Sequence, residues 1–142
     1  MLRPKLPEYD YSLVIRTDFS SDRSWEEVVQ LMQAPQTENA FQASVECISD
    51  KSCVGLTPQT VASVMPTGSQ RAFVFLVDAE AVADPEHPVL VVDLVEEPGR
   101  SFRVVPSEAW GVENNLRLAN MDFEEFAESA DSDSVFRGFP QP

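Results

Sequence analysis

The stretch VVPSEAWGVENNLRLANMDFEEFAE, residues 104–128, holds the end of a strand, a helix and the start of a second helix. It also carries the densest run of specific polar side chains in the chain. Ser107 is placed to cap the first helix through its hydroxyl group. Val112, Leu116 and Ala119 recur at the spacing of one buried helical face. The pattern therefore predicts a helix that begins near residue 107 and buries one side.

The second helix of this stretch has a fuller set of start signals. Asp122 is placed as the N-cap, and Glu125, three residues later, completes a capping box. Met121 is placed to pack on Phe126 as a hydrophobic staple. Asn120 and Asp122 thus have structural roles available to them.

The rest of the chain alternates strand patterns with helix patterns. Strand-like segments occur at residues 13–15, 41–47, 72–77, 89–95 and 102–105. Helix-like segments lie between them, and the side chains predicted to cap these helices are Ser24 together with Glu27, Thr57, and Asp78. This order predicts a single α/β or α+β domain, with a mixed sheet of about five strands flanked by helices.

The turn EEPGR at residues 96–100 predicts that the two strands around it run antiparallel, because proline and glycine suit a tight turn. If Val95 faces Ser101, then Asp93 faces Arg103 as a cross-strand ion pair.

Length and the N-terminal sequence suggest how the chain is organised. A domain of about 142 residues buries roughly 68–70% of the surface that its unfolded chain exposes, so a core without staples is feasible. We expect one domain over residues 1–142, with an extended arm at 1–11 and a globular core at 12–139. The arm has prolines and charges where a signal peptide needs an apolar core, and no apolar run is long enough to span a membrane. The expected location is cytoplasmic.

The net charge of the chain indicates which classes of partner it favours. The chain has 24 Asp and Glu residues against 10 Lys and Arg residues, which gives a net charge of −14. Nucleic acid is therefore the least favoured direct partner, because its phosphates need neutralising cations. An acidic surface suits a basic protein and accelerates its encounter.

Five segments together resemble a known family: SLVIRTDFS at 12–20, HPVLVVDL at 87–94, RSFRVVPSE at 100–108, VENNLRLANMDFEEFA at 112–127 and VFRGF at 135–139. The family is an uncharacterised group of small acidic bacterial proteins known only as a domain of unknown function. The resemblance implies that the chain is one complete bacterial domain, and it assigns no catalytic residue.

Three carboxylates at or near strand ends, Asp18, Asp78 and Asp93, are candidates for catalysis. Clustered carboxylates hold Mg²⁺ or Mn²⁺ for hydrolytic chemistry, so a metal-dependent hydrolase is one alternative function. Each residue also has a structural role open to it, as a turn residue, as a helix cap, or as the partner of Arg103. The spacing matches no metal motif, and we predict no metal ligand and no cofactor.

Nucleophilic catalysis has little support in the residue set. His87 is the only histidine, and it lies in a turn beside Pro88, where a solvated or capping role is expected. Cys47 and Cys53 are too few for a disulfide framework or a zinc site, and we interpret both as thiols. The sequence leaves open whether these two cysteines bond to each other. We predict no catalytic residue.

Two surfaces remain as binding candidates, one within the opening stretch and one that continues a few residues past its end. Amide and indole groups make directional contacts, so Trp110, Glu113, Asn114 and Asn115 could form a recognition face on the first helix. The alternative is that the amides bond to neighbouring backbone and Trp110 fills the core. The second surface is an acidic run without Lys or Arg. Its members are Asp122, Glu124, Glu125, Glu128, Asp131 and Asp133.

These surfaces lead to a functional expectation. We expect a non-enzymatic acidic protein-binding module, of the immunity, inhibitor or regulatory type, whose partner is a basic protein. A nucleic-acid mimic and the metal-dependent hydrolase are the alternatives. The acidic run also fits a helical face that is merely solvated.

Overall fold

The computed structural model describes residues 12–35, 41–66 and 69–139. The predicted extended arm at residues 1–11 lies outside the described residues.

A mixed sheet of six strands runs through the described part of the chain, in the order β2-β1-β3-β4-β5-β6. The strands are β1 (Ser12–Arg16), β2 (Val45–Ile48), β3 (Phe73–Val77), β4 (Val89–Asp93), β5 (Ser101–Val104) and β6 (Val135–Phe136). Strands β2, β1 and β3 run parallel, β4 is antiparallel to both of its neighbours, and β6 pairs parallel with β5. The α/β class and the mixed sheet predicted from the sequence are confirmed, with β6 as an additional short strand.

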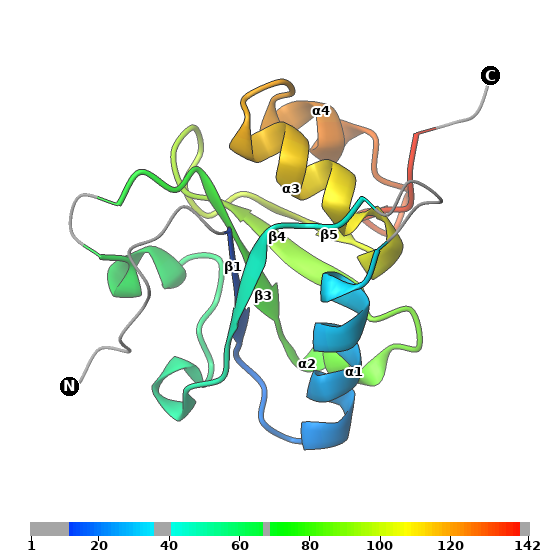
Figure 1. The fold of residues 1–142 in the computed structure, drawn as a ribbon. Helices are drawn as coiled ribbons and strands as arrows, with labels where there is room; N and C mark the ends of the chain where they lie inside the picture. The colour runs from blue at the N-terminus through cyan, green and yellow to red at the C-terminus, as the bar shows by residue number, and fades with distance from the viewer. Residues whose placement is uncertain (1–11, 36–40, 67–68, 140–142) are drawn as a thin grey trace.

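The four α-helices of the described residues cover one face of the sheet, and two short helical turns cover the other (Figure 1). The helices are α1 (Asp22–Gln33), α2 (Ala79–Ala83), α3 (Ala109–Arg117) and α4 (Phe123–Glu128). The 3₁₀ turns on the other face are η1 (Lys51–Cys53) and η2 (Val61–Val64), whereas η3 (Pro106–Glu108) leads into α3 on the helix side. Two apolar clusters fill the layers, one on the helix side around Phe75 and Phe126, the other around Leu13, Cys53 and Val61.

The strands β1, β3 and β4 each contain a continuous apolar run, because both faces of the sheet are buried there. In β1, Val14 packs into the cluster on the helix side, whereas Leu13 and Ile15 pack into the opposite cluster. Successive side chains of a strand point to opposite faces, so a strand between two layers needs apolar residues throughout. The continuous apolar runs in the sequence are therefore the central strands.

Two of the predicted caps are confirmed. The Asp78 side chain accepts a hydrogen bond from the Ala81 amide at the start of α2. Asp122 and Glu125 form the expected capping box of α4.

Three other start signals were assigned wrongly. Helix α1 begins earlier than expected, with the Ser21 side chain accepting from the Ser24 amide in place of a Ser24 cap. Residues 57–65 form turns and η2 instead of an α-helix capped by Thr57. Ser107 lies inside η3, and α3 has no side-chain cap. Each wrong assignment placed a polar residue at a helix start that the backbone locates a few residues away.

The predicted pairing of Asp93 with Arg103 is also wrong. Arg103 lies opposite Leu90, and Ser101 lies opposite Val92. The connection is longer than a tight turn, and the Asp93 carboxylate closes it by accepting from the amides of residues 95, 96 and 97 at 3.0, 3.1 and 2.9 Å. These local bonds move the register and leave Arg103 to another carboxylate.

Candidate functional site

The part of the acidic run that lies on α4 is exposed, because α4 buries only its aromatic side. Phe123 and Phe126, three residues apart, pack into the core and leave the other side of the helix in solvent. We define the α4 acidic face as Glu124, Glu125 and Glu128, all of which are exposed. The Glu125 side chain also reaches back to the amide of Asp122 at 3.4 Å.

The α4 acidic face forms no ion pair with a described residue. None of the ion pairs within the described residues includes Glu124, Glu125 or Glu128. The arginines of the C-terminal half are already paired with other carboxylates: Arg100, Arg103, Arg117 and Arg137. The face therefore presents uncompensated negative charge.

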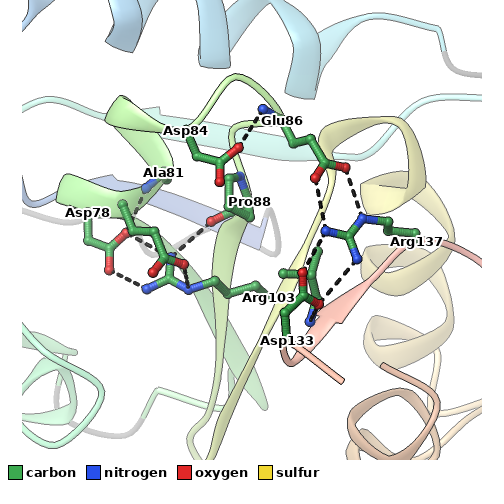
Figure 2. Close-up of polar contacts among 10 residues, drawn as sticks. Asp78, Ala81, Asp84, Glu86, Pro88, Arg103, Asp133 and Arg137 are labelled. Atoms are coloured by element: carbon green, nitrogen blue, oxygen red, sulfur yellow. Dashed lines mark hydrogen bonds and ion pairs between the residues drawn. The ribbon is translucent and has the colours of Figure 1, made fainter. Parts of the chain in front are cut away.

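Elsewhere on the molecule, Arg103 lies among carboxylates whose negative charge it partly neutralises (Figure 2). Its guanidinium group donates to both carboxylate oxygens of Asp78, at 2.9 and 2.8 Å, and to the Pro88 carbonyl at 3.0 Å. The Glu80 carboxylate lies 2.7 Å from its Nε atom. A planar guanidinium fits this two-pronged geometry, and the contacts fix α2 onto β5.

Arg137 gathers a second set of carboxylates just beyond β6 (Figure 2). It donates to both oxygens of Glu86 at 2.9 Å, to Asp131 at 2.7 Å and to Asp133 at 2.7 and 3.2 Å. The contacts join the loop before β4 to the C-terminal segment. We call these residues the arginine network: Asp78, Glu80, Glu86, Arg103, Asp131, Asp133 and Arg137.

The ionisation of the arginine network reflects this pairing. Hydrogen bonds from Arg137 hold the pKa values of Glu86 and Asp133 below their usual ranges. Burial alone would lower the pKa of Arg103, but its hydrogen bonds to Asp78 and the charges of Asp78 and Glu80 raise that pKa above its ordinary value. Glu86, Asp133 and Arg103 are therefore held in their ionised forms. Asp131 and Asp133 belong to the arginine network and not to the uncompensated surface.

Glu113 does not lie on an exposed recognition face, and that expectation is wrong. Its side chain is 1% exposed and accepts hydrogen bonds from the Ser12 hydroxyl at 2.9 Å and the Ser44 amide at 2.7 Å. The Arg117 Nε atom donates to it at 2.7 Å. The carboxylate fastens α3 to the start of β1 and to the segment before β2. Two of its three partners are far away in sequence, which hides this role from local patterns.

Of the other predicted members of that face, Asn115 has the local backbone partner that the alternative interpretation proposed, whereas Trp110 lies outside both apolar clusters and does not fill the core. The Asn115 side chain donates to the Gly111 carbonyl at 2.8 Å, and Asn114 is half-buried. Trp110 is also half-buried, and its ring stacks on Phe41 with centroids 5.1 Å apart and planes 12° apart. Phe41 was assigned to a strand, but it precedes β2 and is 49% exposed.

The three candidate metal-binding carboxylates do not converge. Asp93 lies opposite Phe73 at the start of β3, whereas Asp78 follows the end of β3. Five residues of strand separate the two positions, which is roughly 15 Å. Among the described residues, no group of three His, Cys, Asp or Glu side chains is placed to hold a metal ion.

His87 and the two cysteines have structural surroundings. His87 is buried, with Nδ1 2.8 Å from the Ala81 carbonyl at the end of α2 and Nε2 3.1 Å from a Glu27 carboxylate oxygen. The predicted capping role is confirmed, whereas the alternative of a solvated side chain is wrong because His87 is buried. Cys47 and Cys53 are free thiols that pack into opposite apolar clusters, and burial raises the pKa of Cys47 to about 11.

Comparison with known proteins gives a family without an activity. A family model described as "Domain of unknown function (DUF6924)" matches residues 11–139. No curated protein matches the chain. Within the described residues, no helix is both long enough and apolar enough to cross a membrane.

Proposed function

The chain belongs to the DUF6924 family, and from its geometry we propose that it is a non-enzymatic module that binds a basic protein through the α4 acidic face. We further propose that it acts in the bacterial cytoplasm, as an immunity, inhibitor or regulatory protein does. The observation that carries the proposal is the absence of any ion pair to Glu124, Glu125 or Glu128 within the described residues.

The arginines of the chain are distributed unequally among its carboxylates. A net charge of −14 disfavours the compact state through self-repulsion, and the arginines of the C-terminal half relieve that repulsion at carboxylates outside the α4 acidic face. Carboxylates left exposed and unpaired on one helix create a negative potential that steers a basic protein toward it. Such steering raises association rates toward about 10⁸–10⁹ M⁻¹s⁻¹ at low salt.

Exposed apolar side chains beside α4 supply contact area for the same partner. Leu118, in the connection between α3 and α4, is 54% exposed. Phe139 is also exposed, and its ring packs against Phe126 of α4 with centroids 5.7 Å apart. An interface combines such an apolar centre with a polar rim, and here the rim is acidic.

The test is affinity capture from a lysate of the organism that encodes the chain. The immobilised protein is compared with a variant carrying Glu124→Gln and Glu128→Gln. The matched control carries Glu26→Gln and Glu96→Gln, which remove the same charge at exposed positions on α1 and in the turn after β4. We expect a basic protein that elutes with salt and is lost from the α4 variant alone.

Two results would contradict the proposal. One is that no protein is retained in a salt-sensitive way. The other is that both variants lose the retained protein equally, which would mean that total charge, and not α4, attracts it.

A further inference from the structure

Strand β2 is the edge of the sheet that the described residues leave unpaired. It pairs with β1 alone, and Figure 1 shows it in teal in front of β1. Edge strands expose backbone donors and acceptors that another strand can pair with, and proteins commonly block them with proline, lysine, a bulge or extreme shortness. The sequence of β2, VECI, contains no proline or lysine. The opposite edge, β6, is only two residues long and is followed directly by Arg137 with its carboxylates.

The register identifies the backbone groups on this free edge. The Ser12 amide donates to the Ser44 carbonyl at 3.0 Å, and Ser12 lies opposite Val45. In a parallel ladder, alternate residues of a strand bond to the same neighbour, so Glu46 and Ile48 bond to β1. Val45 and Cys47 therefore direct their amide and carbonyl groups away from the sheet.

The side chains of β2 specify what a strand beside it would need. Val45 and Cys47 pack toward the helix-side cluster, whereas Ile48 packs on the opposite cluster. Glu46 shares the face of Ile48, because alternate residues of a strand point the same way. A neighbouring strand needs apolar residues beside Val45 and Cys47 and a cation beside Glu46, because directly opposed side chains lie about 4.5–5.5 Å apart.

We propose that β2 accepts, as an added strand, an extended segment of a partner protein in which basic and apolar residues alternate. A second copy of the chain is the less suitable occupant. Pairing two β2 strands would bring Glu46 close to its own counterpart and join two bodies that each carry −14. Backbone hydrogen bonds supply the affinity in this mode of recognition, and the alternating side chains supply the selectivity.

The free edge of β2 is separate from the α4 acidic face. Helix α4 packs against β5, at the far end of the strand order from β2. A partner could use either surface without the other, so failure of one proposal leaves the other standing.

The test uses a fluorescent eight-residue peptide that alternates valine and lysine, and a control peptide with four lysines followed by four valines. Composition and charge are the same, so only the alternation differs. The protein variants are Cys47→Pro, which removes an outward amide without touching the β1 ladder, and Cys47→Val, which keeps that amide. We expect the alternating peptide to bind wild type and Cys47→Val alike and to bind Cys47→Pro at least about fivefold more weakly, the effect of one lost hydrogen bond.

Hydrogen exchange on the wild-type protein provides a second readout that does not depend on the folding of the proline variant. The amides of Val45 and Cys47 should exchange freely in the protein alone and become protected when the alternating peptide is added. The amides of Glu46 and Ile48, already bonded to β1, should not change.

Four results would overturn the proposal. Equal binding of the two peptides, or of wild type and Cys47→Pro, would show attraction by charge alone. Protection of Val45 and Cys47 in the free monomer would show that the chain covers its own edge. A wild-type dimer in sedimentation that Cys47→Pro dissociates would identify a second copy as the occupant.

Discussion

The arginine network and the α4 acidic face contain the same kind of side chain in opposite situations. Around Arg103 and Arg137, carboxylates from distant segments meet guanidinium groups at 2.7–2.9 Å. On α4, neighbouring carboxylates face solvent and form no ion pair with a described residue. A carboxylate that is paired between elements contributes to folding, whereas an exposed and unpaired one contributes little. The difference separates the acids that hold the fold from those available to a partner.

The largest loss of stability is expected from replacing Glu113, the most buried of the carboxylates that pair with an arginine. Replacing it by glutamine in Glu113→Gln keeps the volume but removes the charge that Arg117 pairs with, and turns one acceptor into a donor beside the Ser12 and Ser44 donors. We expect a loss of about 2–4 kcal/mol in the free energy of unfolding, measured in urea. Glu124→Gln, the same exchange at a nearby exposed position, is the control. Equal stability of the two variants would remove the distinction between paired and unpaired acids.

The second largest loss of stability is expected from replacing Arg103, because its side chain is only 16% exposed and its partner Asp78 is also mostly buried. Arg103→Met should leave that carboxylate without its cation and lower the free energy of unfolding by about 2–3 kcal/mol. Arg103→Lys, which keeps the charge but not the two-pronged geometry, should fall between wild type and Arg103→Met. If the methionine variant is as stable as wild type, the network does not hold α2 on β5.

Arg137 should have a smaller effect than Arg103, because its network is more open to water and salt. Arg137→Met should move the urea midpoint down at pH 7, by less than Arg103→Met does. Since the folded-state pKa values of Glu86 and Asp133 are lowered, the stability that these groups bring is present above their ordinary values of 4.5 and 3.8. It is lost as the pH falls through the lowered values, so the difference between wild type and variant should shrink there. A difference that grows in acid would contradict this assignment.

Replacing Glu108 should raise the stability of the protein slightly at pH 7, in contrast to the losses expected above. Burial raises its pKa above the ordinary value of 4.5, so the charged form is disfavoured in the folded protein. A raised folded-state pKa contributes stability that is full below 4.5 and is lost as the pH rises through the raised value. Glu108→Gln should therefore be more stable than wild type at pH 7, by about 0.5 kcal/mol or less because the group is largely solvated. The two should converge below pH 4.5, and thermal melts across this range measure the effect.

The sequence predicted the features that depend on near neighbours. The apolar runs of β1, β3 and β4 identify strands buried on both faces, and the caps Asp78 and Asp122 mark helix starts through bonds to amides three residues away. The exposure of Glu124 and Glu128 follows from the spacing of the two phenylalanines of α4. Each of these features is decided within one or two turns of chain.

The features that the sequence missed depend on distant partners. Glu113 bonds to Ser12 across 101 residues, and Arg137 bonds to Glu86 across 51. No local pattern shows that such side chains meet, so Glu113 was placed on the surface and the network around Arg137 was not foreseen. The register of β4 and β5 failed for a related reason, because the bonds of Asp93 to the following amides lengthened the turn. Strand β6 has only two residues, which is too short for any periodicity.

The most direct test of the distinction between the two groups of acids is the free energy of unfolding, in urea at low salt, of a variant carrying Glu124→Gln and Glu128→Gln. If the α4 acidic face is not used for folding, removing two unpaired charges should leave stability within about 0.5 kcal/mol of wild type, or raise it by relieving repulsion. A loss of about 2 kcal/mol or more, comparable to that expected for Arg103→Met, would show that these carboxylates hold the fold and are not held in reserve for a partner.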